Sequence, residues 1–402
     1  MDMKVKIDKK MIFGLILHMA IIILSVLFLY IGHRIAVNGL SVFNQDENIR
    51  TLEVKIIKIV DISDNDVEWS GGSFNDRNIT FEAAAKNAKN KEYITATQNI
   101  NSLYFSFTKE VKEGDKVLLS SYAGGEWYFI DYVRIDKILF LGVIFIVLLL
   151  VFGRIKGLNA ILSLGFTCTA IFAVFIPSLL SGKNIYMMSV IVCIYSVIVT
   201  LFIVNGINKK SFAAVIACFG GIIAIGVLTL VMDNILGLTG LISEESMYLT
   251  YIPTEKPIDL KAVIFAGIMI GAVGAVMDVA MSVSSALWEL KTQASNPTFA
   301  GILKSGINIG KDIMGTMTNT LVLAYIGGSL SLVLLLFVYA SSLAELMNRE
   351  LVIVELLQAI IGSLGILLTM PLTALICALL YSHTHKNQDT EIDEEELARF
   401  RF

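Results

Sequence analysis

Residues 271–290 read GAVGAVMDVAMSVSSALWEL and place Asp278 inside an apolar run that extends from position 262 to position 288. About 20 apolar residues span the hydrocarbon core of a bilayer as a helix. A carboxylate in such a helix is costly, because lipid does not solvate it, so it is either paired or functional. The stretch therefore predicts a membrane-spanning helix with an acid that needs an explanation.

The composition is that of a membrane protein. Of the 402 residues, 55% are hydrophobic and 16% are charged, whereas soluble domains carry about 25% charged residues. The formal net charge of −4 argues against a nucleic-acid partner. The four cysteines lie in apolar runs and form no CxxC pair, which excludes a disulfide framework and a zinc site and predicts buried packing for each. We expect no cofactor.

Runs without Asp, Glu, Lys or Arg predict about eight transmembrane helices, and hence an α-helical polytopic membrane protein. They cover residues 11–33, 138–153, 157–182, 184–208, 211–232, 262–288 with Asp278 inside, 313–344 and 356–382. The chain then divides into an N-terminal anchor (1–33), a polar domain (34–137), a seven-helix membrane domain (138–382) and an acidic tail (383–402).

The basic residues predict the orientation. Lysine and arginine concentrate in cytoplasmic loops, and here they cluster at positions 4–10, 154–156, 209–210 and 291–311. Eight alternating spans place all four clusters on one side. We therefore expect both termini in the cytoplasm and residues 34–137 outside the cytoplasmic membrane.

The polar domain reads mainly as β-structure. TLEVKIIKIVDIS alternates apolar and polar residues, and SLYFSF, KVLLSSY and EWYFIDYVRI predict further strands. FEAAAKNAKNKEY reads either as a short helix or as a polar loop. Several short strands in about a hundred residues suggest a small barrel or sandwich, of which an OB-like barrel is one form. The domain lacks histidine and cysteine and offers no evident metal or nucleophile chemistry.

Asp278 heads a polar stripe on its helix. It is followed at i+4, i+7 and i+11 by Ser282, Ser285 and Glu289. We assign the glycines at i, i+4 and i+7 to the other side of the helix, where small residues let a neighbouring helix approach. These are Gly267, Gly271 and Gly274. On this interpretation the carboxylate faces protein rather than lipid.

A second polar stripe follows in GINIGKDIMGTMTNTLVLAYIGGSL. It consists of Asp312, Thr316, Asn319 and Thr320. Two such stripes at matching depth predict a pocket of oxygen ligands that suits a proton, Na⁺ or a hard divalent cation, with the metal unknown. The alternatives are that the hydroxyls bond their own backbone and that Asp312 lies at the water boundary beside Lys311.

Two further features belong to this second segment. Residues 295–312 predict a short amphipathic segment, with Asn296 as cap and Pro297 at the first helical position. Residues 313–344 would measure about 48 Å as one helix, too long for a straight span. Gly327 and Gly328 therefore predict a helix break, as in transporters with discontinuous spans. The alternative is a helix that continues outside the membrane.

The chain resembles the YibE/F family of bacterial multi-pass membrane proteins. The resemblance rests on GAVGAVMDVAMSVSSALWEL and SGINIGKDIMGTMTNTLVLAYIGGSL, with weaker matches in EGDKVLL and GRIKGLNAILSL. It implies an anchor helix, a small exterior domain and a multi-helix membrane region. It implies no particular activity.

The residues predict a secondary transporter or permease that uses Asp278 for ion or proton coupling. No Walker A, HExxH or nucleophile elbow is present, so we expect no enzyme. The alternative is a receptor-like or scaffolding protein, in which residues 34–137 bind a ligand or an envelope protein and the buried polar groups only fix helix packing. Partners under either hypothesis are the lipid bilayer and a small ion or solute, or an envelope protein.

Overall fold

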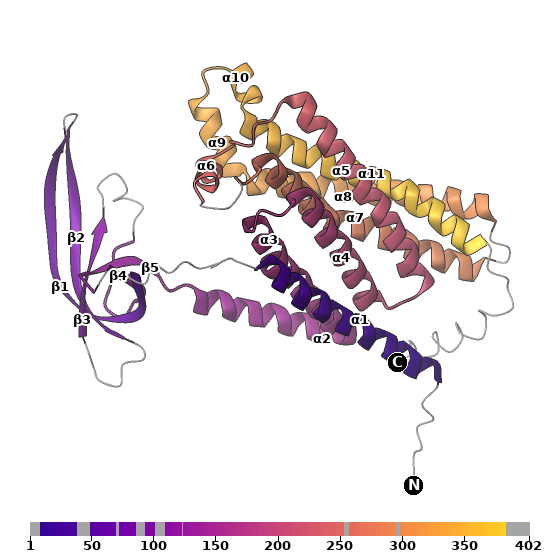
Figure 1. Ribbon diagram of the computed structural model, residues 1–402, viewed down its shortest axis with the longest axis horizontal. Coiled ribbons are helices and arrows are strands. Elements are labelled where there is room, and N and C mark those ends of the chain that lie inside the picture. The colour runs from indigo at the N-terminus through magenta and orange to yellow at the C-terminus, as the bar shows by residue number, and fades with distance from the viewer. Residues whose placement is uncertain are drawn as a thin grey trace, which may run out of the picture. The chain divides into compact units, whose positions relative to one another are not determined.

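A computed structural model describes residues 9–37, 49–69, 72–85, 93–100, 109–122, 124–252, 257–294 and 298–382. The chain divides into two compact units. One unit comprises residues 1–40 and 149–402 and is a helical bundle, and the other comprises residues 41–148 and contains a β-barrel (Figure 1).

Long helices account for most of the described residues. In chain order they and the short helices between them are α1 (Lys9–Ala36), α2 (Ile135–Thr169), a π-helical turn (Ala170–Phe175), α3 (Ile176–Leu180), α4 (Ile185–Asn205), α5 (Lys209–Leu236), α6 (Glu244–Thr250), α7 (Leu260–Gln293), α8 (Phe299–Gly328), α9 (Leu330–Tyr339), α10 (Leu343–Asn348) and α11 (Glu350–Ser382). Six of them are long and apolar enough to cross a membrane, and α8 with α9, bent by 62°, makes a seventh. The predicted polytopic fold is confirmed.

Two predicted spans are joined in one helical stretch of 46 residues, Ile135–Leu180. Its backbone is broken at Arg154, which adopts φ 47° and ψ −125°. A Cβ atom on Gly157 would lie only 2.0 Å from the carbonyl oxygen of Leu149. Residues eight apart in a straight helix are separated by about 12 Å, so the chain must fold back sharply at this break.

Local sequence explains where several helices begin. The side chain before α4, α5, α7 and α8 accepts a hydrogen bond from a backbone N–H three residues later, as a helix N-cap does. These caps are Asn184, Asn208, Asp259 and Thr298. Gly237 ends α5 in the left-handed conformation, with φ 62°.

The α8 start differs from the sequence prediction. Thr298 caps the helix, and Asn296 and Pro297 lie outside the described residues. Residues 299–312 form no separate surface segment, because α8 runs unbroken from Phe299 to Gly328.

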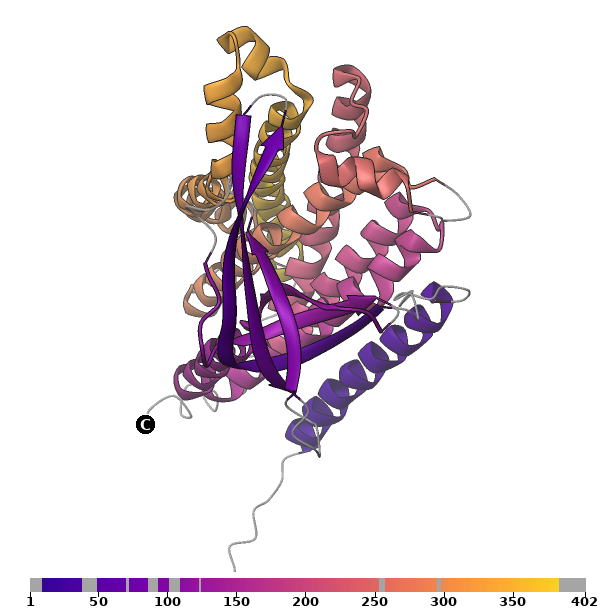
Figure 2. The same ribbon diagram turned by 90° about the vertical axis from the view of Figure 1, so that its left-hand side faces the viewer.

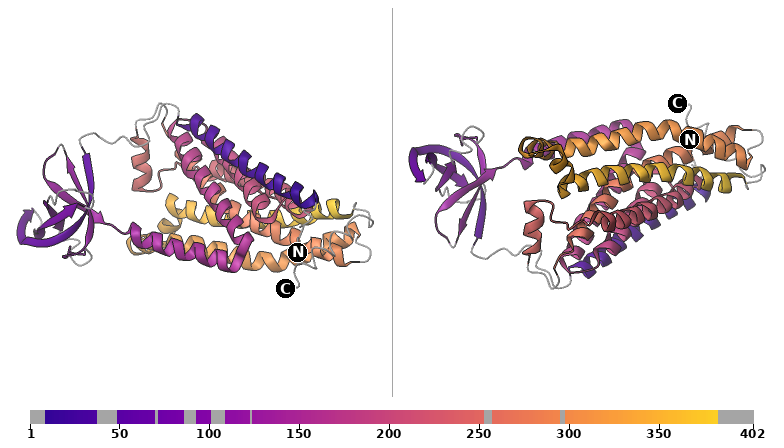
Figure 3. Two further views of the ribbon diagram at one scale, coloured as in Figure 1. Left: turned by 90° about the horizontal axis from the view of Figure 1, so that it is seen from below. Right: turned by 90° about the horizontal axis from the view of Figure 1, so that it is seen from above.

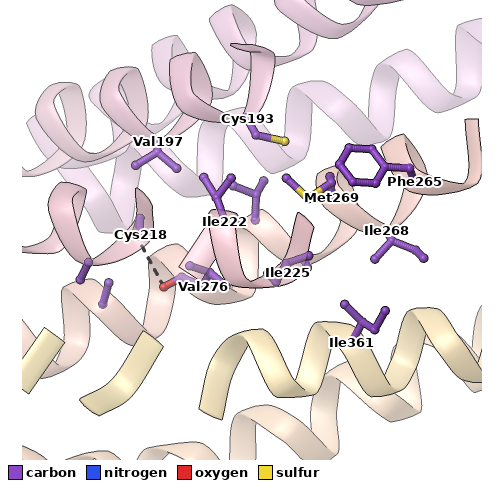
Figure 4. Packing of buried hydrophobic residues seen from close by; sticks show 14 of the residues in the cluster. Cys193, Val197, Cys218, Ile222, Ile225, Phe265, Ile268, Met269, Val276 and Ile361 are labelled. Atoms are coloured by element: carbon purple, nitrogen blue, oxygen red, sulfur yellow. Dashed lines mark hydrogen bonds between the residues drawn. The ribbon is translucent and has the colours of Figure 1, made fainter. Parts of the chain in front are cut away.

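The bundle core lies between α4, α5, α7 and α11 (Figure 4). Phe265, Met269 and Val276 of α7 are buried there, as α7 packs against α4, α5, α8 and α11. Cys193, Cys218 and Cys377 are buried as expected, and the Sγ atom of Cys218 lies 3.9 Å from the carbonyl oxygen of Val276. Cys168 is exposed instead, so that prediction was wrong.

The second unit contains a closed five-stranded barrel, seen in Figure 2. Its strands are β1 (Ile49–Trp69), β2 (Gly72–Ala85), β3 (Tyr93–Ile100), β4 (Lys116–Tyr122) and β5 (Trp127–Tyr132). They follow the order β1-β2-β3-β5-β4, and only the β3–β5 pair is parallel. Ile56, Phe81 and Leu119 are among the residues that fill the interior. The predicted β-rich domain between the first two spans is confirmed.

Individual strands follow the sequence in part. TLEVKIIKIVDIS lies in β1, KVLLSSY is β4, and EWYFIDYVRI contains β5. The helical interpretation of FEAAAKNAKNKEY was wrong for residues 81–85, which belong to β2. The predicted strand SLYFSF lies outside the described residues.

Arg77 of β2 links two acids on the barrel surface. Its guanidinium donates to both carboxylate oxygens of Asp64, at 2.7 and 3.0 Å, and to Glu110 at 2.7 Å. These hydrogen bonds hold the pKa of Asp64 below its ordinary value. A carboxyl whose pKa is lower in the folded state stabilises the fold above its unfolded pKa, near pH 4, and loses that effect as the pH falls through the folded pKa.

We expect Arg77→Gln to increase amide hydrogen exchange in β1 and β2 at pH 7. The difference from the unmodified protein should shrink at a pH below the folded pKa of Asp64, where this carboxyl is protonated in both states. Exchange measured on the full-length protein, corrected for the intrinsic rate at each pH, checks this. Lys58→Gln removes a cation from the exposed side of β1 and should leave exchange unchanged. An equal difference at both pH values contradicts the role of Asp64.

Candidate functional site

The stripe on α7 lies on the exposed side of that helix. Asp278, Ser282 and Glu289 are exposed, and Ser285 is half-buried. The opposite side of α7 is buried in the bundle and includes Val276 and Ala280. No hydrogen bond or ion pair joins the Asp278 carboxylate to a residue that the structure describes. The acid is therefore placed at the surface of this chain.

The α7 glycines share the face of Asp278, so their assignment to the other side was wrong. All three are exposed, and they are Gly267, Gly271 and Gly274. Spacings of 11, 7 and 4 residues to Asp278 correspond to nearly whole helical turns, which puts all four on one face. Nothing lies within 4 Å of a Cβ atom built on Gly267 or Gly274. Gly267 and Gly274 thus leave open positions beside the polar stripe, whereas Gly271 is covered by Tyr325 and Gln358.

The second stripe also lies on an exposed side. All four predicted members, Asp312, Thr316, Asn319 and Thr320, are exposed. The same side of α8 also exposes Lys304, Asn308, Lys311 and Gly315. The hydroxyl groups of Thr316 and Thr320 donate to backbone carbonyls three residues earlier, both at 2.9 Å. Their donors are thus used within the helix, while their oxygens can still accept a hydrogen bond.

Two close contacts set the register of α7 against α8. Leu287 lies against Gly306, where a Cβ atom would be 2.9 Å from the leucine Cδ1. Tyr325 lies against Gly271 in the same way, with its hydroxyl oxygen 2.7 Å from the built Cβ. The two helices therefore run antiparallel.

This register places the two stripes at the same depth. Asp278 is nine residues from Leu287, which corresponds to position 315 on α8, and seven from Gly271, which corresponds to position 318. Asp278 is therefore level with Thr316. The same counting places Ser282 level with Asp312. Matching depth was the sequence expectation, and helix packing supports it.

The two stripes are exposed on neighbouring helices. α11 packs against both helices (Figure 3), and on α8 it covers the side of Gly306 and Gly310, which contact Ala374 and Met370. The exposed stripe of α8 lies away from this side, and the exposed stripe of α7 lies away from the buried side of α7. On the face of Asp278, Gly271 lies close to Tyr325 of α8 and Gln358 of α11. We call the two stripes together the α7–α8 polar face, formed by Asp278, Ser282, Ser285 and Glu289 of α7 and Lys304 to Thr320 of the α8 stripe. In the part of the chain that the structure describes, most residues of both stripes are exposed.

The helix break lies close to its predicted position. α8 ends at Gly328, and α9 leaves it at 62°. The N–H of Ser329 still donates to the carbonyl of Tyr325 at 3.0 Å, and its carbonyl accepts from Val333 at 2.9 Å. The bend therefore preserves these backbone hydrogen bonds across the junction.

The helical bundle corresponds to a known family. The model of the YibE/F-like protein family matches residues 141–383. The chain belongs to this family. The match contains α7 and α8 with both stripes, and it excludes the five barrel strands. No curated protein and no solved structure matches the chain.

This YibE/F-like protein has polar contacts that the sequence analysis missed. The Glu350 carboxylate accepts hydrogen bonds from the N–H groups of Thr239 and Gly240, at 2.6 and 2.7 Å, and from the Thr239 hydroxyl at 2.7 Å. Lys261 of α7 lies 3.7 Å from Asp233 of α5. No sequence spacing links Glu350 to a loop 110 residues earlier, so only the fold identifies this contact.

A second missed cluster ties the other ends of the same helices. The Ser284 hydroxyl of α7 donates to the carbonyl of Lys210 at 2.9 Å and lies 2.8 Å from the Tyr381 hydroxyl of α11. Trp288 meets the Tyr381 ring edge-on at 5.1 Å. These groups are buried and hydrogen-bonded, so they fasten the YibE/F-like bundle rather than form a site.

No group of three or more His, Cys, Asp or Glu in the described ranges could hold a metal ion. Near the α7–α8 connection, Ala286, Glu289, Leu290, Gln293 and Ala294 line an open cleft of about 450 Å³. The carboxylate of Asp278 has no described hydrogen bond or ion pair. It can take up a proton or a cation.

Proposed function

We propose that this protein is a secondary transporter or permease, rather than an enzyme, and that Asp278 binds the coupling ion or proton. The observation that carries the proposal is the unpaired carboxylate of Asp278 on a helix long enough to cross a membrane. An ionisable group in such a position commonly marks an ion or proton pathway.

Oxygen and amide groups lie close to the same depth. Thr316 is level with Asp278, Asn319 is one turn or less away, and Asp312 is level with Ser282. Such groups could share a cation or a proton with Asp278. The bent α8–α9 pair gives further support, since transporters often build their sites from discontinuous helices.

The proposal includes an orientation. The positive-inside rule places both termini in the cytoplasm and the barrel outside the cytoplasmic membrane of a bacterium. The barrel would then control access to the path or bind an envelope protein.

Flux measurements on proteoliposomes test the role of Asp278. Vesicles that contain the purified full-length protein and a pH-sensitive dye receive an imposed Na⁺ gradient, and ²²Na⁺ uptake is followed in parallel. We expect protein-dependent proton or sodium flux, and at least a roughly tenfold loss in Asp278→Asn, which cannot bind the ion as a charged group. Asp278→Glu should retain part of the flux.

Glu113→Gln serves as the matched control, because this exposed acid lies in a turn of the barrel. It should transport like the unmodified protein. Full flux in a folded Asp278→Asn variant would refute the role of Asp278. Flux no greater than that of empty vesicles, for both ions, would favour the receptor-like or scaffolding alternative instead.

A further inference from the structure

The α7–α8 polar face carries a chemistry that lipid does not satisfy. The exposed side of α5 presents Ile223, Val227 and Val231, which suit a hydrocarbon environment. The α7–α8 polar face instead exposes carboxylates, lysines, amides and glycines along helices of membrane-spanning length. Charged groups in a bilayer face protein or water. This face therefore needs a polar occupant.

The face has opposite charges at one end. Glu289 lies two residues beyond Leu287 on α7, and Lys304 lies two residues before Gly306 on α8. Because Leu287 and Gly306 are in contact, Glu289 and Lys304 are at the same depth. Both side chains are exposed. An acid on one helix is thus level with a base on the other.

The other end of the face pairs an open glycine position with a protruding side chain. Gly274 leaves an open position on α7, since nothing lies within 4 Å of a Cβ atom built on it. Leu323 lies two residues before Tyr325 on α8, so its depth is close to that of Gly274, and its side chain is 57% exposed. An open glycine position on α7 is therefore level with a protruding leucine side chain on α8. Helices in membranes often pack with small residues at such contacts.

A two-fold axis parallel to the helices would use all of these features at once. Such an axis keeps every residue at its own depth and brings α7 of one copy against α8 of the other. Glu289 of one copy then lies near Lys304 of the other, and Gly274 lies near Leu323. Asp278 lies near hydroxyl and amide groups of the other α8. We propose that the α7–α8 polar face binds a second copy of this chain, with α7 and α8 of each copy against α8 and α7 of the other.

This interface would complete the surroundings of Asp278. In one chain its carboxylate has no described partner. In the dimer the partner subunit's Asn319 brings an amide that can donate a hydrogen bond. The inference goes beyond transport and does not depend on it, since the same face needs covering in a scaffolding protein.

Two copies with different tags test the contact directly. One copy carries Ser285→Cys on α7 and the other Asn308→Cys on α8, positions that are level by the same count from Leu287 and Gly306. Both carry Cys168→Ala, which removes the exposed native cysteine and leaves three buried ones. A short bis-maleimide is added to membranes that contain both copies. We expect a cross-linked species with both tags.

The control replaces Asn308→Cys by Ile223→Cys, on an exposed side of α5. It should give no mixed species. Absence of the Ser285→Cys/Asn308→Cys product, while the same two changes in one chain still link internally, would overturn the proposal. An equally strong product with Ile223→Cys would overturn it too, because random collision would then explain both.

Charge exchange gives a second, independent measurement. Glu289→Lys or Lys304→Glu alone should lower the mixed cross-link roughly two- to fivefold, as expected for a modest ion pair. The double variant should restore it, since it keeps both charges with their places exchanged. If the double variant gives as little mixed cross-link as the single variants, Glu289 and Lys304 do not meet across the interface.

Discussion

Gly157→Ala should prevent the chain from folding to a stable form. The new Cβ atom would lie 2.0 Å from the Leu149 carbonyl oxygen, and a backbone group cannot move aside as a side-chain end can. The fold-back at Arg154 would have to open, which displaces both parts of α2. We expect a cost at or above the upper end of the roughly 1–3 kcal/mol typical of overpacking. The detergent-solubilised variant should lose its monodisperse peak in size-exclusion chromatography.

Gly153→Ala is the matched control. It makes the same chemical change four residues earlier in the same helix, where nothing lies within 4 Å of the new atom. This variant should purify like the unmodified protein. A stable Gly157→Ala variant with an unchanged melting temperature would show that the chain does not fold back as described.

Gly306→Val should separate α8 from its neighbours. Even a single Cβ atom there would lie 2.7 Å from the Ala374 Cβ, 3.2 Å from its Cα, and 2.9 Å from Leu287. Valine adds two further methyl groups at this junction of α7, α8 and α11. We expect a loss of about 3 kcal/mol or more. The melting temperature of the purified protein should fall, and Ile302, now fully buried, should become accessible to labelling when replaced by cysteine.

Gly165→Val controls for the cost of valine in a helix. Gly165 is exposed on α2 and has open space around it, so only the small propensity difference applies. The melting temperature should change little. Equal destabilisation by Gly165→Val and Gly306→Val would contradict the tight three-helix junction.

The sequence predicted the fold class because its signals are local. Charge-free runs revealed the spans, and alternating residues such as those of KVLLSSY revealed strands. β2 and β3 were missed, because FEAAA is as compatible with a helix as with a strand. This segment is a strand because it pairs with β1 and β3 in the closed barrel. The sequence of the segment alone does not reveal that pairing.

The sequence identified the polar residues of both stripes but not the helices that surround them. The period of α7 identified the stripe from Asp278 to Glu289, and the same period, applied to Gly267, should have placed the glycines on that face. Which side of α7 is buried was not predictable, since both sides contain small and apolar residues. Packing against α4, α5 and α11 determines which side of α7 is buried, and Asp278 lies on the other, exposed side. Long-range contacts such as Glu350 with Gly240 have no sequence signature.

Polar contacts join α5, α7 and α11 at both ends of these helices. Glu350 and the Asp233–Lys261 pair join these helices at one end, and Ser284 with Tyr381 and the Lys210 carbonyl joins them at the other. The described side-chain hydrogen bonds of α8, by contrast, stay within α8 or its cap. Polar contacts thus join α5, α7 and α11 at both ends, whereas α8 is held by close packing at Gly306 and Gly310.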